Sequence, residues 1–282
     1  MNKVLIIGAS GYLGNVIYKE LLSYYDAYGT YCTQEGLFGE NQVFYSYDAA
    51  EDSLTEVLQQ VQPNVIISAF KAEPEHLINA HLQLVDYVNQ HPTSQLIYLS
   101  SYVVFDAQTK FPSYESDKPM AESGFGKLTI SLEKLLQEHI PTQHCIVRLP
   151  LVLGINSPQI TQLRQAIRHQ ASFEVFPNLI ISTTTADKLA QQIQYIVNQR
   201  LLGIYHLSST DVIHHDDLFK EISEKLANKF PIFKSVYSSN DDRYLAILPR
   251  DNQLPETYQI TVAEVIESSS LSEEITTLKA SS

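Results

Sequence analysis

The sequence predicts an α/β protein in which a doubly wound parallel sheet carries a smaller C-terminal α+β lobe. Three observations support this class: a fully apolar run, Val4–Ile7, leads into a glycine-rich segment, short β-like runs then alternate with helical patterns, and the alternation stops after Pro150. Strands that alternate with helices form βαβ units, whose parallel sheet is covered on both faces. We therefore expect a first domain over residues 1–150 and a second lobe over residues 151–282, with Gly203–Leu207 returning to the main sheet.

The expected elements of the first domain follow one another in βαβ order. Each strand is short and rich in apolar or β-branched residues, and each helix carries apolar residues three or four positions apart. The expected strands are Val4–Ile7, Ala27–Cys32, Gln42–Tyr47, Asn64–Ala69, Gln95–Ser100 and Gln143–Leu149. The expected helices are Asn15–Tyr25, Asp52–Val61, Pro74–Gln90 and Met120–His139. Pro63, Pro92 and Pro141 each stand shortly before a strand, where a helix has to stop.

The second lobe has fewer strand signals. We expect helices over Pro158–His169, Thr185–Gln199 and His215–Lys229 and short strands over Leu179–Ser182, Gly203–Leu207 and Phe233–Ser238. In a doubly wound sheet a ligand lies across the carboxyl ends of the strands. The second lobe should therefore pack on that edge and serve as a substrate lobe.

Composition excludes several classes of protein. The 282 residues include 19 Lys and Arg against 32 Asp and Glu, a formal net charge of −13. Such a surface repels nucleic-acid phosphates and anionic lipid, so we expect neither as a partner. Cys32 and Cys145 lie far apart, which excludes a disulfide framework and a cysteine zinc site, and we expect no metal. No apolar run reaches the length of a signal-peptide core or a membrane span, so we expect a cytoplasmic protein.

The strongest local signal is the loop Gly8-Ala9-Ser10-Gly11-Tyr12-Leu13-Gly14, between a buried strand and a helix. Glycines let the backbone turn tightly and approach a pyrophosphate, and the helix N-terminus offers amide groups and a positive dipole end. This context is typical of a Rossmann-like NAD(P)-binding domain, although a strand-to-helix turn without a ligand is the alternative. The predicted cofactor-binding residues of the loop are Gly8, Ser10, Gly11, Tyr12, Leu13 and Gly14.

The end of the second expected strand bears on the choice of dinucleotide. It offers neither an acidic residue for the ribose of NAD nor an arginine for the 2′-phosphate of NADP. Thr30, Thr33 and Gln34 can hydrogen-bond a phosphate, so we favour NADP over NAD. Asp48, which closes the third strand, either meets an adenine amino group or caps the following helix.

Several segments in order resemble the extended short-chain dehydrogenases. Gly8-x-x-Gly11-x-x-Gly14 is similar to their glycine loop, and Pro63–Ala69 looks like their fourth strand, which ends beside the cofactor. That resemblance implies that Ala69 and Phe70 contact the dinucleotide. Leu99-Ser100-Ser101 looks like the strand that carries the catalytic Ser or Thr, at Ser101.

The second half resembles one branch of that superfamily, the dTDP-4-dehydrorhamnose reductases. Arg148–Gly154 is similar to the stretch that leads into the substrate lobe, and Gly203–Leu207 is similar to the branch's G-x-Y-H-L strand. Pro249–Asn252 resembles its Arg-Pro-x-Asn element with the first pair transposed. The resemblance implies a nucleotide-sugar ligand. Its expected contacts are Tyr114, in a proline-aromatic-acidic loop, Arg148 and Arg250.

One departure from the family concerns catalysis. The family pairs Tyr and Lys four residues apart on a helix, and the tyrosine exchanges the substrate proton. Here Lys127 occupies the lysine position, but Ser123 occupies the tyrosine position, and a serine hydroxyl is a much weaker acid. Tyr102, next to Ser101, stands near the site. The catalytic candidates are thus Ser101, Lys127, Tyr102 and Ser123.

Three interpretations of this gap remain. The first is a protein similar to nucleotide-sugar 4-keto reductases that transfers hydride from NAD(P)H with a relocated proton donor, Tyr102 or Tyr114. The second is different chemistry on the same scaffold. The third is a non-catalytic protein that binds dinucleotide or sugar nucleotide as a regulatory or assembly subunit; a regulatory subunit of methionine adenosyltransferase has a similar scaffold. We expect either a homo-oligomer or a complex with a partner enzyme.

Overall fold

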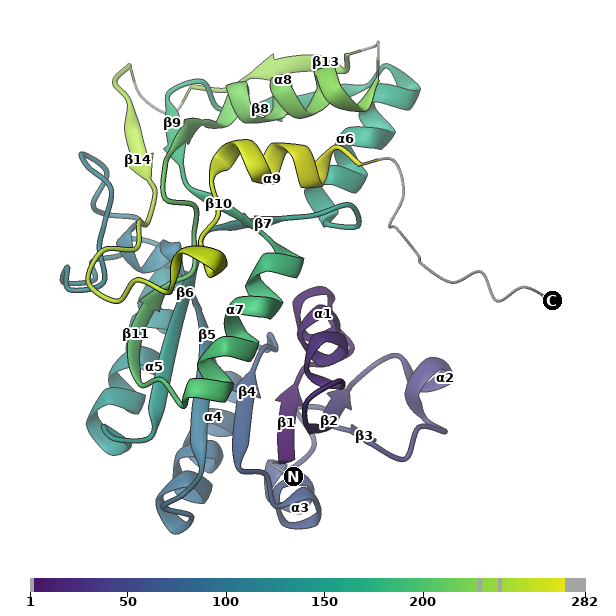
Figure 1. Ribbon diagram of the computed structural model, residues 1–282, viewed down its shortest axis with the longest axis vertical. Helices are drawn as coiled ribbons and strands as arrows, with labels where there is room; N and C mark the ends of the chain where they lie inside the picture. The colour runs from purple at the N-terminus through teal and green to yellow at the C-terminus, as the bar shows by residue number, and fades with distance from the viewer. Residues whose placement is uncertain (1–2, 228–229, 238–239, 272–282) are drawn as a thin grey trace.

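The computed structural model describes residues 3–227, 230–237 and 240–271. Its centre is a seven-stranded sheet in the order β11-β6-β5-β4-β1-β2-β3, in which every pair of neighbours is parallel (Figure 1). The strands are β1 (Lys3–Ile7), β2 (Asp26–Tyr31), β3 (Phe44–Ser46), β4 (Val65–Ser68), β5 (Gln95–Ser101), β6 (His144–Leu149) and β11 (Gly203–His206). The expected doubly wound parallel sheet is confirmed.

Helices cover both faces of this sheet. They are α1 (Tyr12–Leu21), α3 (Leu54–Val61), α4 (Pro74–Gln90), α5 (Gly124–His139) and α7 (Ala186–Gln199). Successive residues of β1 point to opposite faces. Val4 and Ile6 join the core with α1 and α7, whereas Leu5 and Ile7 join the core with α3, α4 and α5. Two apolar cores therefore explain why residues 4–7 of β1 are all apolar.

Two helix starts differ from the expected ones by three residues or more, for local reasons. Helix α1 begins at Tyr12, three residues before the expected Asn15, because it starts directly at the glycine loop. Helix α5 begins at Gly124, after the expected Met120, because the side chain of Ser123 caps it. In the first domain two short elements were not expected: α2 (Glu35–Phe38) and the 3₁₀ turn η1 (Tyr102–Phe105).

The smaller lobe lies beyond the carboxyl edge of the sheet (Figure 1). Its helices are α6 (Pro158–His169), α8 (His215–Leu226) and α9 (Val262–Ser269), with a short 3₁₀ turn η2 (Glu256–Tyr258). Its strands are β7 (Leu151–Leu153), β8 (Ser172–Val175), β9 (Leu179–Ile181), β10 (Thr183–Thr185), β12 (Ile213–His214), β13 (Ile232–Ser235) and β14 (Arg243–Leu245). A third apolar core joins α6, α8 and α9 to these strands. The ends of two expected elements, residues 228–229 and 238, lie outside the described residues.

The two parts of the chain interleave. Helix α7 packs on α1, and β11 pairs with β6 at the edge of the main sheet, although both follow residue 150. The first strand pair of the small lobe, β7 with β10, brings residues after β6 beside residues before α7. The carboxyl edge of the sheet is thus enclosed by segments from both halves of the sequence.

Candidate functional site

The glycine loop folds back tightly over the start of α1. Gly8 has φ +86°, and its N–H donates to Oγ1 of Thr30 at 2.8 Å. The N–H of Gly11 donates to the carbonyl oxygen of Gly8 at 3.0 Å. A Cβ on Gly14 would lie 2.2 Å from that same oxygen, a distance that no side chain tolerates. The close approach of α1 to the loop therefore requires glycine at position 14.

The N-terminus of α1 has the features of an anion cradle. No side chain caps the helix at Gly11, and no acidic residue stands in the first turn. A Cβ on Gly11 would meet only the Gly8 oxygen within 4 Å, at a tight 3.3 Å, so beyond that oxygen the space beside Gly11 is open. Uncapped N–H groups and the positive end of the helix dipole favour a phosphate. These residues fit the pyrophosphate of a dinucleotide.

Tyr12 reaches from the glycine loop to the small lobe. Its hydroxyl donates to the carbonyl oxygen of Leu153 at 3.4 Å. Gly154 has φ +148°, and a Cβ there would lie 2.7 Å from the same hydroxyl. Ser10 stays at the loop, where its N–H donates to the carbonyl of Thr30 at 3.3 Å, while Leu13 packs against the sheet core.

The end of β2 is surrounded by carboxylates. Thr30, expected to meet a phosphate, is buried and holds Gly8 instead. Oδ1 of Asp48 accepts the N–H of Ala50 at 2.9 Å, while its own N–H donates to Asp52 at 2.7 Å. Burial raises the pKa of the Cys32 thiol, and Asp48, Asp52 and Glu51 raise it further. Asp48 therefore forms a turn beside Cys32 at this edge.

A buried histidine supports the loop after β4. The N–H of Ala69 donates to Ile7 at 2.9 Å, and the ring of Phe70 stacks on His81 with 5.8 Å between centroids. Nδ1 of His81 faces the Leu77 carbonyl at 2.8 Å, so Nε2 accepts from the Ser68 hydroxyl at 3.0 Å. Burial lowers the pKa of His81 to about 4, which keeps the ring neutral. His81 is not among the residues predicted from the sequence, because nothing in its spacing distinguishes it.

The start of α5 shows what the serine at the tyrosine position does. Oγ of Ser123 accepts the N–H of Gly126 at 3.0 Å and donates to Asp106. The same carboxylate accepts the N–H of Glu122 at 2.6 Å and of Ser123 at 3.3 Å. Lys127, one turn along α5, is exposed. The Ser123 hydroxyl is thus engaged in capping α5.

The other two catalytic candidates lie at the carboxyl end of β5. Oγ of Ser101 accepts the N–H of Val103 at 3.4 Å and caps η1. Tyr102 packs against a small core that includes Phe105. Burial raises the pKa of Tyr102, and the charge of Asp106 raises it further. A phenol with a raised pKa is a weaker proton donor than the tyrosine it would replace.

Arg148 lies inside the fold, although we expected it among the substrate contacts. Only 1% of it is exposed, and its Nε and Nη2 bind the two carboxylate oxygens of Glu133 at 3.0 and 2.8 Å. Glu133 also accepts from the Ser100 hydroxyl at 2.5 Å, and Nη1 of Arg148 donates to His206 at 3.4 Å. The guanidinium thus links α5 to β6 inside the fold and is not exposed at the surface.

The remaining substrate candidates, Tyr114 and Arg250, lie together. The guanidinium carbon of Arg250 is 3.9 Å from the centre of the Tyr114 ring. We call residues 113–117 the ligand loop and residues 246–252 the C-terminal segment. Ser113 joins the two, since its N–H donates to Ala246 at 2.9 Å and its carbonyl accepts from Leu248 at 3.0 Å. The structure thus places two residues 136 positions apart in direct contact.

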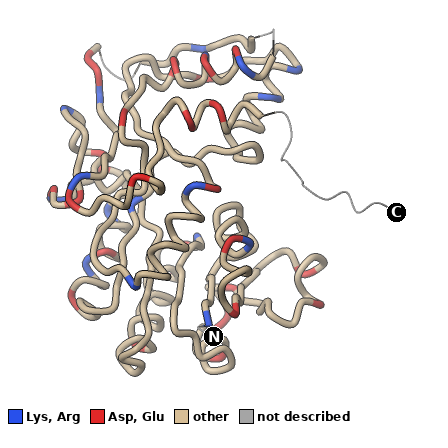
Figure 2. Tube along the Cα trace, in the orientation of Figure 1, with Lys and Arg blue, Asp and Glu red and all other residues tan. Residues whose placement is uncertain are grey.

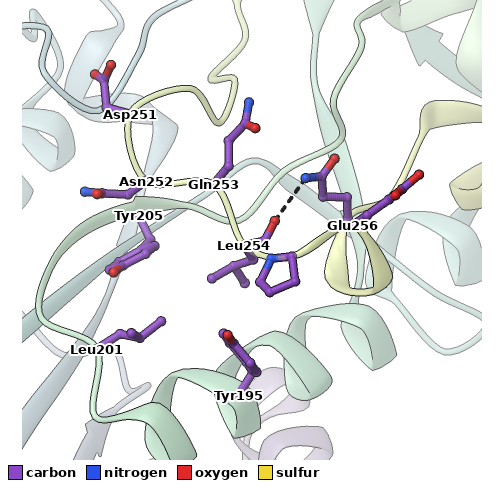
Figure 3. Close-up of a pocket in the computed structure, with 10 residues that line it drawn as sticks. Tyr195, Leu201, Tyr205, Asp251, Asn252, Gln253, Leu254 and Glu256 are labelled. Carbon is purple, nitrogen blue, oxygen red and sulfur yellow. Dashed lines mark hydrogen bonds between the residues drawn. The ribbon is translucent and has the colours of Figure 1, made fainter.

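Two cavities lie away from the glycine loop. The larger, about 560 Å³, runs along the edge strand β11 beneath the stretch that follows Asp251 (Figure 3). Tyr195, Leu201 and Tyr205 form its apolar wall, and Asn252 bonds the Ile204 carbonyl at 2.8 Å. The smaller, about 310 Å³, lies between α7 and α9. Neither cavity contains a predicted catalytic or cofactor residue.

Basic and acidic positions are interspersed along the chain, and acidic positions occur on helices of both lobes (Figure 2). Within residues 3–227, 230–237 and 240–271, no helix is long and apolar enough to cross a bilayer. In the same described ranges no three His, Cys, Asp or Glu side chains come together to hold a metal ion.

Several known proteins are similar to this chain in sequence or in fold. A curated relative, the methionine adenosyltransferase 2 subunit beta of Danio rerio, is 25% identical over 74% of this chain and 69% of its own length. Two solved structures share the fold. The dTDP-4-dehydrorhamnose reductase of Bacillus anthracis, in complex with NADP, has a TM-score of 0.75, 19% identity and coverage of 95% of this chain and 98% of its own. The enzyme WbmH of Bordetella bronchiseptica, in complex with NAD⁺, has a TM-score of 0.78, 17% identity and coverage of 95% and 97%.

A family match covers the whole described sheet and most of the small lobe. The RmlD substrate binding domain matches residues 1–256, which include the glycine loop, Ser101, Lys127, the ligand loop and Arg250. This chain therefore belongs to the RmlD substrate binding domain family.

Proposed function

We propose that this protein binds a nicotinamide dinucleotide and a nucleotide-sugar-like ligand without turning them over, and acts as a regulatory or assembly subunit of a partner enzyme. The family match supports the sugar-nucleotide half of this proposal. The relative from Danio rerio is named as a subunit of an enzyme, which supports the partner. Two solved neighbours hold NADP or NAD⁺, which supports the dinucleotide.

The observation that carries the proposal is the use of the Ser123 hydroxyl. A bound dinucleotide would supply hydride, but reduction of a keto sugar also needs a proton donor. At the family's donor position stands a serine whose hydroxyl caps α5 and bonds Asp106. Lys127 stands at the expected lysine position, but the expected tyrosine position holds Ser123, which has no phenol for the lysine to activate. Loss of a general acid costs about 10²–10⁴ in rate.

The dinucleotide would lie over the glycine loop, with Gly8, Gly11 and Gly14 giving the backbone room for its phosphates. Ala69 and Phe70 flank the loop, since a Cβ on Gly8 would lie 2.8 Å from the Ala69 oxygen. The sequence favoured NADP, but the carboxylates of Asp48, Glu51 and Asp52 beside Cys32 would repel a 2′-phosphate. We therefore favour NAD(H) for this protein.

A reductase with a relocated donor is the second candidate. Tyr102 favours it, because this phenol directly follows Ser101 at the carboxyl end of β5. The raised pKa of Tyr102 weakens it as an acid. The two functions differ in one measurable property, since only the second needs the Tyr102 hydroxyl.

The experiment measures binding and turnover on the same samples. Calorimetry with NADH and NADPH should give heat with NADH, while absorbance at the nicotinamide band should not fall when a dTDP-4-keto sugar is added. Ser123→Tyr should then produce measurable turnover, because Lys127 regains a phenol one helical turn away. Rapid wild-type turnover that Tyr102→Phe abolishes would replace the proposal by the second candidate. Absence of heat with either dinucleotide, on folded protein, would refute the binding half.

A further inference from the structure

The carboxylate of Glu115 is a buried anchor in the ligand loop. The residue is 5% exposed. Oε2 accepts the backbone N–H groups of Arg250 and Asp251, each at 3.1 Å, and Oε1 accepts the N–H of His206 at 3.4 Å. A buried carboxylate needs such donors, because burial without them is costly. One side chain therefore ties the end of β11 to the C-terminal segment.

The backbone that Glu115 holds carries a guanidinium with an unused edge. Nε of Arg250 donates to Asp251 at 3.1 Å, and Nη2 donates to the Ser116 hydroxyl at 3.2 Å. Tyr114 covers one face of the guanidinium plane. Among the hydrogen bonds of the described residues, none uses Nη1 of Arg250. Because the side chain is half exposed, this edge is available to a ligand.

The ligand loop is also held from inside the protein. Nη1 of Arg148 donates to the backbone oxygen of Glu115 at 3.3 Å, while Glu133 on α5 holds the other nitrogens of Arg148. The place of Glu115 is thus set by the buried ion pair between α5 and β6. The loop and the helix that carries Lys127 share one rigid support.

We propose that Glu115 is a positioning residue: it holds Arg250 against Tyr114 and thereby sets the affinity of this site for the diphosphate of the nucleotide-sugar ligand. This rests on the proposed function above. Arginine suits phosphate oxygens, and stacking on Tyr114 fixes the plane of its guanidinium. Asp251 competes with the ligand, because its carboxylate already binds the same guanidinium. Without the Glu115 acceptors, the backbone at 250–251 is released and Arg250 swings into solvent.

Titration of dTDP by calorimetry tests the ligand. Glu115→Gln removes one acceptor oxygen and should weaken dTDP binding about tenfold, with NADH affinity unchanged. Asp251→Asn should strengthen dTDP binding. Glu174→Gln is the matched control, because Glu174 pairs with Lys234 at an exposed site in the small lobe, and it should leave both affinities unchanged. Equal dTDP affinity in wild type and Glu115→Gln would overturn the proposal.

The NMR signal of the Arg250 Nε–H group tests the positioning without any ligand. Stacking on Tyr114 shifts this signal by the ring current, and Arg250→Gln identifies it. In Glu115→Gln the signal should move to the value of a solvated arginine, whereas in Glu174→Gln it should stay. An unmoved signal in folded Glu115→Gln would overturn the proposal. If the wild-type protein binds no dTDP, the proposed ligand is wrong. The Arg250 Nε–H signal would still show whether Glu115 positions Arg250. Should Glu115→Gln not fold, unchanged dTDP affinity in Tyr114→Leu would overturn the proposal instead.

Discussion

At the scale of single residues, the serine at the expected tyrosine position acts as a helix cap. Ser123 has φ −67° and ψ +149°, the extended backbone of an N-cap, and its hydroxyl accepts from the third residue of the helix. Asp106 then bonds both the backbone and the side chain at this position. A tyrosine here would lack a short side chain able to cap α5. A side chain at this position can therefore cap α5 only if it is short.

The first prediction follows from that cap. Ser123→Ala should lower the free energy of unfolding by about 1 kcal/mol, because the N–H of Gly126 loses its acceptor. Asp106→Asn should lower it too, and the double variant should lose less than the sum, since the two side chains bond each other. Urea unfolding of the four proteins measures this. Strict additivity would mean that the two residues cap α5 independently.

The second prediction concerns the buried ion pair of Arg148 and Glu133. Glu133→Gln should lower the free energy of unfolding by roughly 3–5 kcal/mol, because a fully buried guanidinium is left without its charge partner. Replacing both residues by Met should cost less than Glu133→Gln alone. Glu174→Gln at an exposed pair serves as the control and should be within error of wild type. A loss for Glu133→Gln as small as the control's would contradict a buried ion pair.

At the scale of elements, the strand–loop–helix unit of β1 and α1 depends on close backbone contact. The loop leaves no room at Gly14, where α1 meets the Gly8 carbonyl. Gly124, in the first turn of α5, has nothing within 4 Å of an added Cβ. The two glycines thus look alike in the sequence but differ in what surrounds them.

The third prediction compares these two glycines. Gly14→Ala should lower the free energy of unfolding by roughly 1–3 kcal/mol and abolish NADH binding, because the loop must open to admit the methyl group. Gly124→Ala should raise it by roughly 0.4–1 kcal/mol, since alanine restricts the unfolded chain and meets no clash. Urea unfolding and NADH calorimetry check both. Normal NADH binding by Gly14→Ala would show that the loop is not the dinucleotide site.

At the scale of the whole molecule, segments from both halves of the sequence pack together, since α7 and β11 join the main sheet. His81 and His206 are buried between elements from different parts of the chain, and His215 is half-buried. Burial lowers the pKa of His81 and of His215 to about 4, and burial followed by the Arg148 charge lowers that of His206 to about 3. All three are neutral in the folded protein above those values.

The fourth prediction is the resulting loss of stability in mild acid. In the unfolded chain these histidines take up protons near the ordinary histidine pKa of 6.5, whereas the folded protein does so only near pH 3–4. The unfolded state therefore binds more protons, and stability falls as pH drops from about 6.5 towards 4. His81 alone should account for about 3 kcal/mol of that fall. Urea unfolding at several pH values checks it: His81→Gln should flatten the slope, and an unchanged slope would contradict a neutral buried ring.

Much of the fold was determined by local patterns in the sequence. Periodicity placed the strands and helices of the main sheet, because a sheet buried on both faces needs apolar strands and each covering helix needs an apolar stripe. The glycine loop was visible because its geometry tolerates few other residues. The three-residue pairs of the small lobe were missed: β7 and β10 carry no alternation long enough to read, and only contact between distant segments makes them strands.

The roles of individual polar residues were decided by tertiary structure alone. The sequence predicted the same role, substrate contact, for Arg148 and Arg250. In the fold Arg148 is buried and pairs with Glu133, whereas Arg250 lies at the surface against the ring of Tyr114. The Ser123 hydroxyl caps α5 through the nearby Gly126, but its second partner, Asp106, lies 17 positions away and is brought to the start of α5 by the fold. The physical reason is the separation along the sequence between the residues that interact. Helix and strand patterns arise from neighbours within a few positions, whereas the partner of a charge or hydroxyl depends on which segments the finished fold brings within about 3–4 Å.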